Sequence, residues 1–130
     1  MDFHIKEILT RYKKIAVIGL SPNSDRASYG VTRYLIEQGY DVVGVRPGTQ
    51  EILGVPVYSS LKEIPGEVEI VDVFRDTAAV PAIVEEAIQK KAKVLWLQEG
   101  VTHTEAEKRA RDAGLSVVSN RCILKEHRKI

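Results

Sequence analysis

The sequence predicts an α/β fold: a doubly wound, Rossmann-like parallel sheet of about five strands, covered on both faces by helices in three αβα layers. Five short apolar runs have the length of buried strands, and segments with a helical spacing of apolar residues lie between them. Glycines and prolines mark several of the boundaries. A chain of 130 residues is long enough for one such core, so we expect a single domain over 1–130.

The predicted strands are short runs dominated by valine, isoleucine and leucine. In chain order they are Lys14–Ile18, 41–45, 69–74, 93–98 and 115–119. Continuous apolar runs of this length are typical of strands that are buried on both faces. With right-handed crossovers, we favour the strand order 3-2-1-4-5 over the flavodoxin-like order 2-1-3-4-5.

The predicted helices carry apolar residues at helical spacing. In chain order they are a segment containing Phe3, Ile5, Ile8 and Leu9, then 28–39, 76–92, 102–114 and 121–129. Gly39 and Gly114 suit C-terminal helix ends. Pro81 suits a first helical turn, and Thr102 with Glu105 has the spacing of a capping box.

The stretch 46–68 is the least regular part of the chain, because prolines and glycines interrupt it. It predicts only a short edge strand at Val55–Tyr58 and one helical turn at 60–64.

Composition limits the class of protein. Hydrophobic residues make up 44% and charged residues 28% of the chain, as in ordinary globular proteins. The net charge of +1 argues against a nucleic-acid surface, and no apolar stretch approaches the length of a membrane span. The N-terminus lacks the apolar core of a signal peptide, so we expect a cytoplasmic protein. One cysteine excludes an internal disulfide, and the histidines have no metal-ligand spacing.

Ligands of doubly wound sheets bind beyond the carboxyl ends of the strands, beside the first strand. Residues that follow the predicted strands are therefore candidate ligand contacts. In strand order they are Gly19, Leu20 and Ser21, then Arg46 and Pro47, then Phe74 and Arg75, then Gln98 and Glu99, and finally Asn120 and Cys122.

The turn after the first strand departs from a dinucleotide fingerprint, because Gly19 is not followed by the other glycines of G-x-G-x-x-G. Ser21 and Ser28 offer hydroxyls, Arg26 offers a guanidinium, and the next helix offers its first amides. This set favours a pyrophosphate over 21–29, a segment that includes Tyr29. The alternative is that the serines only shape the turn.

Arg46 ends the second strand, where an NAD site usually places an acid for the ribose hydroxyls. An arginine suits an additional phosphate on the ribose, as in NADP or coenzyme A. Pro47 and Phe74 offer apolar surface for an adenine. The alternatives are a solvated charge at Arg46 and a core position for Phe74.

The sequence also resembles a known family. The resemblance spans roughly 12–128 and rests on "VIGLSPNSDRASYGV", "VGVRPG…ILGVPVYSSLKEIP", "VDVFRDTAAVPAIVEEAI", "VLWLQEGV" and "NRCILKEH". Together these stretches resemble the small stand-alone CoA-binding domain proteins and, more distantly, the N-terminal CoA-binding domain of the succinyl-CoA synthetase alpha subunit.

The resemblance implies a coenzyme A or acyl-CoA ligand, with 19–24 at its phosphates and 97–99 along its pantetheine arm. Thr49 stands where the synthetase has a lysine, so Arg46 or Arg26 would supply that charge. Asn120 stands where small family members often have an acid. The synthetase's phosphohistidine lies in a second domain, so ligase chemistry does not follow from the fold.

Catalytic groups are not evident. Asp72 and Glu99 are candidate acids near strand ends without a recognisable pairing, and His103 is expected at the surface or as a helix cap. Cys122 lies beside Arg121 near a helix start, where positive charge favours a thiolate. It could form a mixed disulfide with coenzyme A; the alternative is a small buried hydrophobe.

These observations favour a module that binds coenzyme A or an acyl-CoA, in a binding or regulatory role, with no nucleic-acid or membrane partner. A homodimer or a protein partner could form through the N-terminal helix. One alternative is an NADP-type oxidoreductase, which the missing glycines disfavour. The other is an interaction subunit that has lost its ligand, which Arg26 and Arg46 disfavour.

Overall fold

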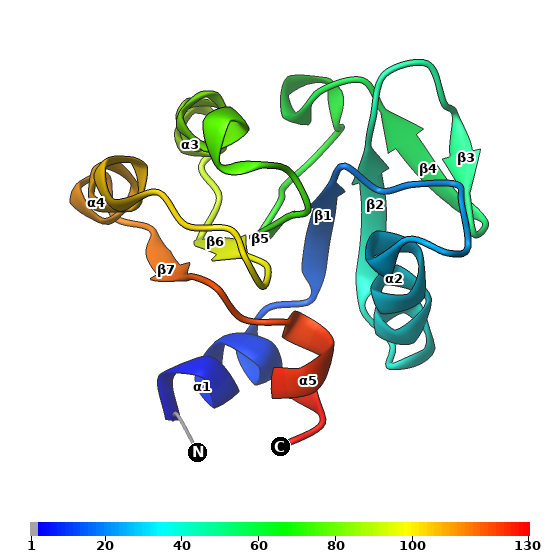
Figure 1. The fold of residues 1–130 in the computed structure, drawn as a ribbon, viewed down its shortest axis with the longest axis horizontal. Coiled ribbons are helices and arrows are strands. Elements are labelled where there is room, and N and C mark those ends of the chain that lie inside the picture. Colours follow the sequence, from blue (N-terminus) through cyan, green and yellow to red (C-terminus); the bar gives the residue numbers. More distant parts are fainter. Residues whose placement is uncertain (1–2) are drawn as a thin grey trace.

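The protein is described by a computed structural model over residues 3–130. Its centre is a seven-stranded sheet with the order β3-β4-β2-β1-β5-β6-β7 (Figure 1). The strands are β1 (Lys14–Ile18), β2 (Asp41–Val45), β3 (Glu51–Ile52), β4 (Val55–Tyr58), β5 (Ile70–Val73), β6 (Val94–Leu97) and β7 (Ser116–Val118). Neighbouring strands are parallel, except for the antiparallel pair of β3 and β4.

Helices cover both faces of this sheet, as the three-layer prediction requires (Figure 1). They are α1 (Phe3–Arg11), α2 (Ala27–Glu37), α3 (Val80–Gln89), α4 (Thr104–Asp112) and α5 (Ile123–His127), with 3₁₀ turns η1 (Leu61–Glu63) and η2 (Thr77–Ala79). The apolar residues of α1, α2 and α5 pack on one face, and those of α3 and α4 pack on the other. Within residues 3–130, the structure has no helix of the length and apolarity needed to cross a membrane.

Both faces of the central strands are buried. In β1, Ala16 and Ile18 belong to the core under α3 and α4, whereas Val17 belongs to the core under α1, α2 and α5. This alternation follows from the two-residue repeat of a strand. All four residues of β5 and of β6 are buried, which explains why β6 is continuously apolar and why β5 is apolar except at Asp72.

The α/β class and the parallel sheet are confirmed, but the order of the strands differs from the prediction. β4 pairs with β2 through Gly44↔Val57 and Val45↔Tyr58, and so takes the place expected for the 69–74 strand. That strand, β5, pairs instead with the opposite edge of β1. The five predicted strands therefore follow the order 2-1-3-4-5, and the sheet is extended by β4 and the two-residue β3.

Candidate functional site

A cavity of about 540 Å³ opens where β1, β2 and β5 end. Six predicted contact residues line it: Gly19, Ser21, Arg26, Ser28, Arg46 and Phe74. The sequence did not single out Pro22, Asn23 and Ala27, which also line it. Their only signal was their position inside the segment 21–29, because Pro and Asn are ordinary turn residues.

Gly19 lets the chain turn sharply over the end of β1. Its φ is +85°, a region that side chains rarely adopt. A Cβ at this position would lie 2.6 Å from the carbonyl oxygen of Phe74. The Gly19 amide also donates to the carbonyl of Val45 at 2.9 Å, so the turn is fixed to the end of β2.

The loop between β1 and α2 is shaped by its own polar side chains. The Ser28 hydroxyl accepts from the Ser21 amide at 3.0 Å, and the Ser21 hydroxyl accepts from the Asn23 amide at 3.1 Å. Asn23 Oδ1 accepts from the Asp25 amide at 2.9 Å. Ser21 and Ser28 therefore shape the turn, as the alternative interpretation predicted. Each hydroxyl serves here as an acceptor, so its own hydrogen can still be donated into the cavity.

The start of α2 is positively charged. Arg26 is the N-cap residue, makes no side-chain capping bond, and is followed by a first turn without an acid. A cation at this end opposes the helix dipole by about 0.3–1 kcal/mol. Arg26, Arg46 and Arg75 form no ion pair with any residue in the described part of the chain. This arrangement favours a bound anion, which would satisfy both the helix amides and the guanidinium groups.

Four predicted contact residues lie beside the cavity without lining it. Leu20 is fully buried and packs so closely on β2 that a Cβ on Gly44 would lie 2.8 Å from its Cδ2. Tyr29 is half-buried against the same core. Pro47 and Arg75 are exposed at the ends of β2 and β5.

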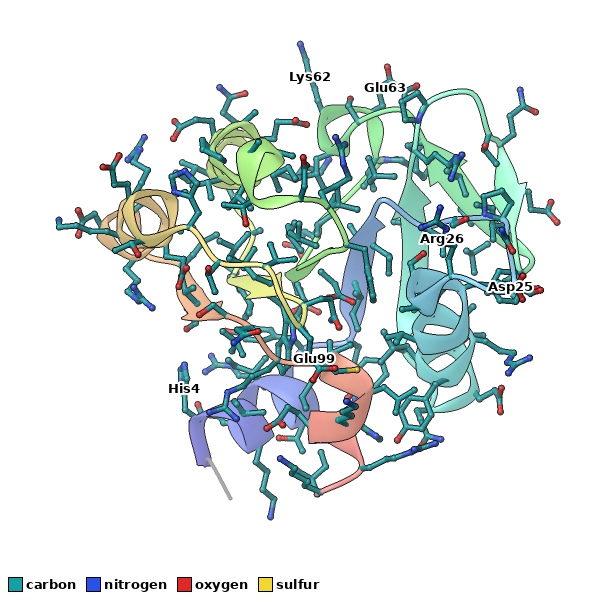
Figure 2. The ribbon with its side chains drawn as sticks, viewed as in Figure 1. His4, Asp25, Arg26, Lys62, Glu63 and Glu99 are labelled. Atoms are coloured by element: carbon teal, nitrogen blue, oxygen red, sulfur yellow. The ribbon has the colours of Figure 1, made fainter. Side chains whose placement is uncertain are left out.

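A second group of predicted residues lies further along the same edge, at the ends of β6 and β7. Figure 2 shows Glu99 close to the start of α5, whereas Arg26 lies on the loop before α2. Lys125 donates to the Glu99 carboxylate at 2.9 Å, and the Gly100 amide donates to Asn120 Oδ1 at 2.7 Å. Cys122 is half-buried at the N-cap of α5. None of these residues lines the cavity.

Asp72 is a fully buried acid in β5. Its Oδ1 accepts from Gln98 Nε2 at 2.5 Å, and its Oδ2 has no hydrogen-bond partner among residues 3–130. Burial raises the pKa of Asp72 to about 7, and the Gln98 bond offsets part of that effect. Asp72 and Glu99 do not pair, because Glu99 is held by Lys125.

The other candidate groups have structural roles. His103 Nδ1 accepts from the Ala106 amide at 3.1 Å and so caps α4. The Glu107 carboxylate accepts from the His103 amide at 2.8 Å, so the cap lies one residue after the predicted Thr102 and its acid two residues after the predicted Glu105. Within residues 3–130, no group of three or more His, Cys, Asp or Glu residues could hold a metal ion.

Comparison with known proteins identifies clear relatives. Residues 13–128 match the family described as "CoA binding domain". The chain is 42% identical over 123 residues to the uncharacterized protein YneT of Bacillus subtilis (strain 168). This match covers 95% of this chain and 91% of YneT. The solved structure of a hypothetical protein from Pyrococcus horikoshii OT3 has a TM-score of 0.93 and 46% identity, and the match covers 99% of this chain and 91% of that one.

One relative with a named activity is the alpha subunit of ADP-forming acetate–CoA ligase I of Pyrococcus furiosus. It is 37% identical over 95 residues, which is 68% of this chain. The match covers 21% of the ligase subunit, so this chain corresponds to about a fifth of that protein.

Proposed function

The chain belongs to the CoA binding domain family, and from this premise we propose that it binds coenzyme A, or an acyl-CoA, at the carboxyl edge of its sheet. One observation carries the assignment of the site. Of residues 3–130, those lining the cavity beside β1 include two arginines without ion pairs, the first residues of α2, and no acid. Such a site suits a ligand with several phosphates.

We assign the ligand's phosphates to two arginines. The diphosphate lies over the start of α2, within reach of Arg26 and the Ser28 hydroxyl. The 3′-phosphate on the ribose is bound by Arg46, which lies where an NAD site has an acid. Phe74 and Pro47 contact the adenine. The remaining arm follows the ends of β5, β6 and β7, past Gln98, Glu99, Asn120 and Cys122.

The proposed role is that of a binding or regulatory module. Calorimetric titration tests it, with coenzyme A, 3′-dephospho-CoA, NADP and NAD as ligands. We expect coenzyme A to bind most tightly. Removing the 3′-phosphate or making Arg46→Ala should each weaken binding about tenfold to a hundredfold, the usual range for one charged hydrogen-bonded contact.

The two changes should not add. Arg46→Ala should bind coenzyme A and 3′-dephospho-CoA equally, because the variant lacks the group that distinguishes them. A preference for NADP would contradict the assignment and favour an oxidoreductase. Absence of binding by all four ligands would favour an interaction subunit.

A mixed disulfide at Cys122 is a separate expectation of this proposal. The Cys122 thiolate would attack one sulfur of oxidised coenzyme A, forming a protein–CoA disulfide and releasing one coenzyme A thiolate. Intact-mass measurement checks it. An adduct that persists in Cys122→Ser, or no adduct in the wild type, would exclude this reaction.

A further inference from the structure

Asp72 and Gln98 form a buried polar pair within an apolar layer. Asp72 pairs in register with Val17 of β1 and Trp96 of β6, and both belong to the core under α1, α2 and α5. Gln98 is 4% exposed, and its Nε2 donates to Asp72 Oδ1. A polar pair that is this incompletely satisfied costs stability, which calls for a functional explanation.

The position of Gln98 connects this pair to the proposed ligand site. Val73 and Leu97 are register partners, and the Gln98 amide donates to the Val73 carbonyl at 3.3 Å. One step further along the two strands, Gln98 falls beside Phe74, which lines the cavity. Gln98 therefore lies next to the lining of the cavity, on the side of β6.

The hydrogen bond to Asp72 fixes the orientation of the Gln98 amide group. Its Nε2 is used by Asp72, which leaves Oε1 as an acceptor. The arm of coenzyme A carries amide N–H groups, which can donate to such an oxygen. Without Asp72, the amide of Gln98 could rotate and present its N–H groups instead.

The charge of Asp72 decides whether this orientation persists. In the uncharged acid, Oδ1 accepts from Gln98 and Oδ2 carries the proton. The carboxylate accepts the Gln98 bond more strongly, which offsets part of its burial cost, but its Oδ2 is a buried charged atom without a partner among residues 3–130. The cost of such an atom favours entry of water or opening of the β5–β6 end, and either displaces Gln98.

We propose that uncharged Asp72 is a positioning residue that holds Gln98 for the arm of the ligand, so that ionisation of Asp72 weakens ligand binding. This inference rests on the function proposed above. It adds a proton-linked control of affinity to that function.

Among the described residues, no charged group contributes to the raised pKa of Asp72, which follows from burial and is partly offset by the Gln98 bond. The residues of α1 that are buried over this face, Ile5, Ile8 and Leu9, are apolar. The titratable groups of the other covering helices that are buried or half-buried are Tyr29 and Tyr34 of α2, and Cys122, Glu126 and His127 near or in α5. The remaining charged groups of these helices, Arg33, Glu37 and Lys125, are exposed. Glu126 is paired with Arg121 and Lys129, and His127 is bonded to Tyr34.

Calorimetric titration with coenzyme A across neutral pH tests the proposal in the wild type and in Asp72→Asn. The wild-type dissociation constant should rise by up to about tenfold for each pH unit above about 7, because binding then requires uptake of one proton. Asp72→Asn keeps an oxygen for Gln98 and cannot ionise, so its affinity should lack this rise. The ligand's phosphates titrate equally in both experiments, so the variant corrects for them.

The outcomes separate the two proposals. If the wild type binds coenzyme A and both proteins show the same pH dependence, the role of Asp72 is wrong although the proposed function stands. If the wild type fails to bind at any pH, the proposed function is wrong and this inference falls with it. Should Asp72→Asn not fold, the carboxyl ¹³C resonance of wild-type Asp72 decides: its pKa must rise when coenzyme A is added, and an unchanged pKa would overturn the proposal.

Discussion

The carbonyl oxygen of Phe74 occupies the space that a Cβ on Gly19 would need, since the two atoms would lie 2.6 Å apart. The end of β5 thus lies directly against the turn that leaves β1. Phe74 and the loop before α2 therefore line the same cavity. The cavity depends on a residue without a side chain at position 19.

The Gly19→Ala variant should therefore lose stability. The methyl group would combine a left-handed φ with a clash against backbone, at a cost of about 1–3 kcal/mol. Chemical denaturation of the variant and of Gly30→Ala provides the comparison. Gly30 lies in α2 with nothing within 4 Å of its Cβ position, so alanine there should stabilise by about 0.5–1 kcal/mol. Equal effects of the two substitutions would show that the Phe74 contact is unimportant.

Most elements of the fold were predictable because they depend on local sequence, whereas the two-residue β3 was not predicted. The run at Lys14–Ile18 specifies a buried strand without reference to the rest of the chain. The strand order was not predictable in the same way. It depends on which segment pairs with β2, and β4 does so through only two registered pairs, at Val57 and Tyr58. A segment this short, containing Pro56, gives a weak strand signal although it determines the topology.

The position of the cavity was predictable to a similar degree. Residues that directly follow β1, β2 and β5 line the cavity because parallel strands end at one edge. The hydrogen bond between Asp72 and Gln98 joins residues 26 positions apart, so no local sequence pattern predicts it. Leu20 shows that position after a strand is not sufficient for a residue to line the cavity. Its side chain packs in the core over Gly44.

Arg26→Ala should weaken coenzyme A binding about tenfold to a hundredfold, because the variant loses a charged contact to the diphosphate. The salt dependence of binding should decrease in parallel. Arg33→Ala is the matched control, since Arg33 lies on the exposed side of α2 and, among residues 3–130, pairs with Glu37 alone. Calorimetry at two salt concentrations measures both effects. An equal loss of affinity in the two variants would mean that Arg26 acts only through the general field of the protein.

Asp72 should also make stability depend on pH in a definite direction. Its pKa is about 7 in the folded protein and near 3.8 when unfolded, so the folded state holds the extra proton between these values. The wild type should lose up to about 1.4 kcal/mol per pH unit through this range relative to Asp72→Asn, with no further change above it. Urea denaturation of both proteins at several pH values checks this. A constant difference between them would contradict the raised pKa.

His127 should make stability depend on pH in the opposite direction, with stability lost as the pH falls. Its Nδ1 lies 2.6 Å from the hydroxyl of Tyr34, and burial, followed by the charge of Lys13, lowers its pKa. Protonation therefore favours the unfolded chain, and this contribution to stability is lost as the pH falls below about 6.5. In a histidine NMR titration, Lys13→Ala should raise the pKa of His127 toward its ordinary value. Lys6→Ala, an exposed change on α1, should leave it in place; a shift in both would indicate a long-range charge effect.

The N-terminus of α4 offers a test of which residue caps it. Thr102 and Glu105 have the sequence spacing of a capping box, yet the structure gives the capping bond to His103, whose Nδ1 accepts from the Ala106 amide. His103→Ala should therefore lower the free energy of unfolding by about 1 kcal/mol, the usual cost of a lost N-cap. The exposed Thr102 makes no hydrogen bond with a described residue through its hydroxyl, so Thr102→Ala should change stability by less than about 0.5 kcal/mol. Denaturation of the two variants side by side separates the cases, and a larger loss in Thr102→Ala would restore the capping box that the sequence predicted.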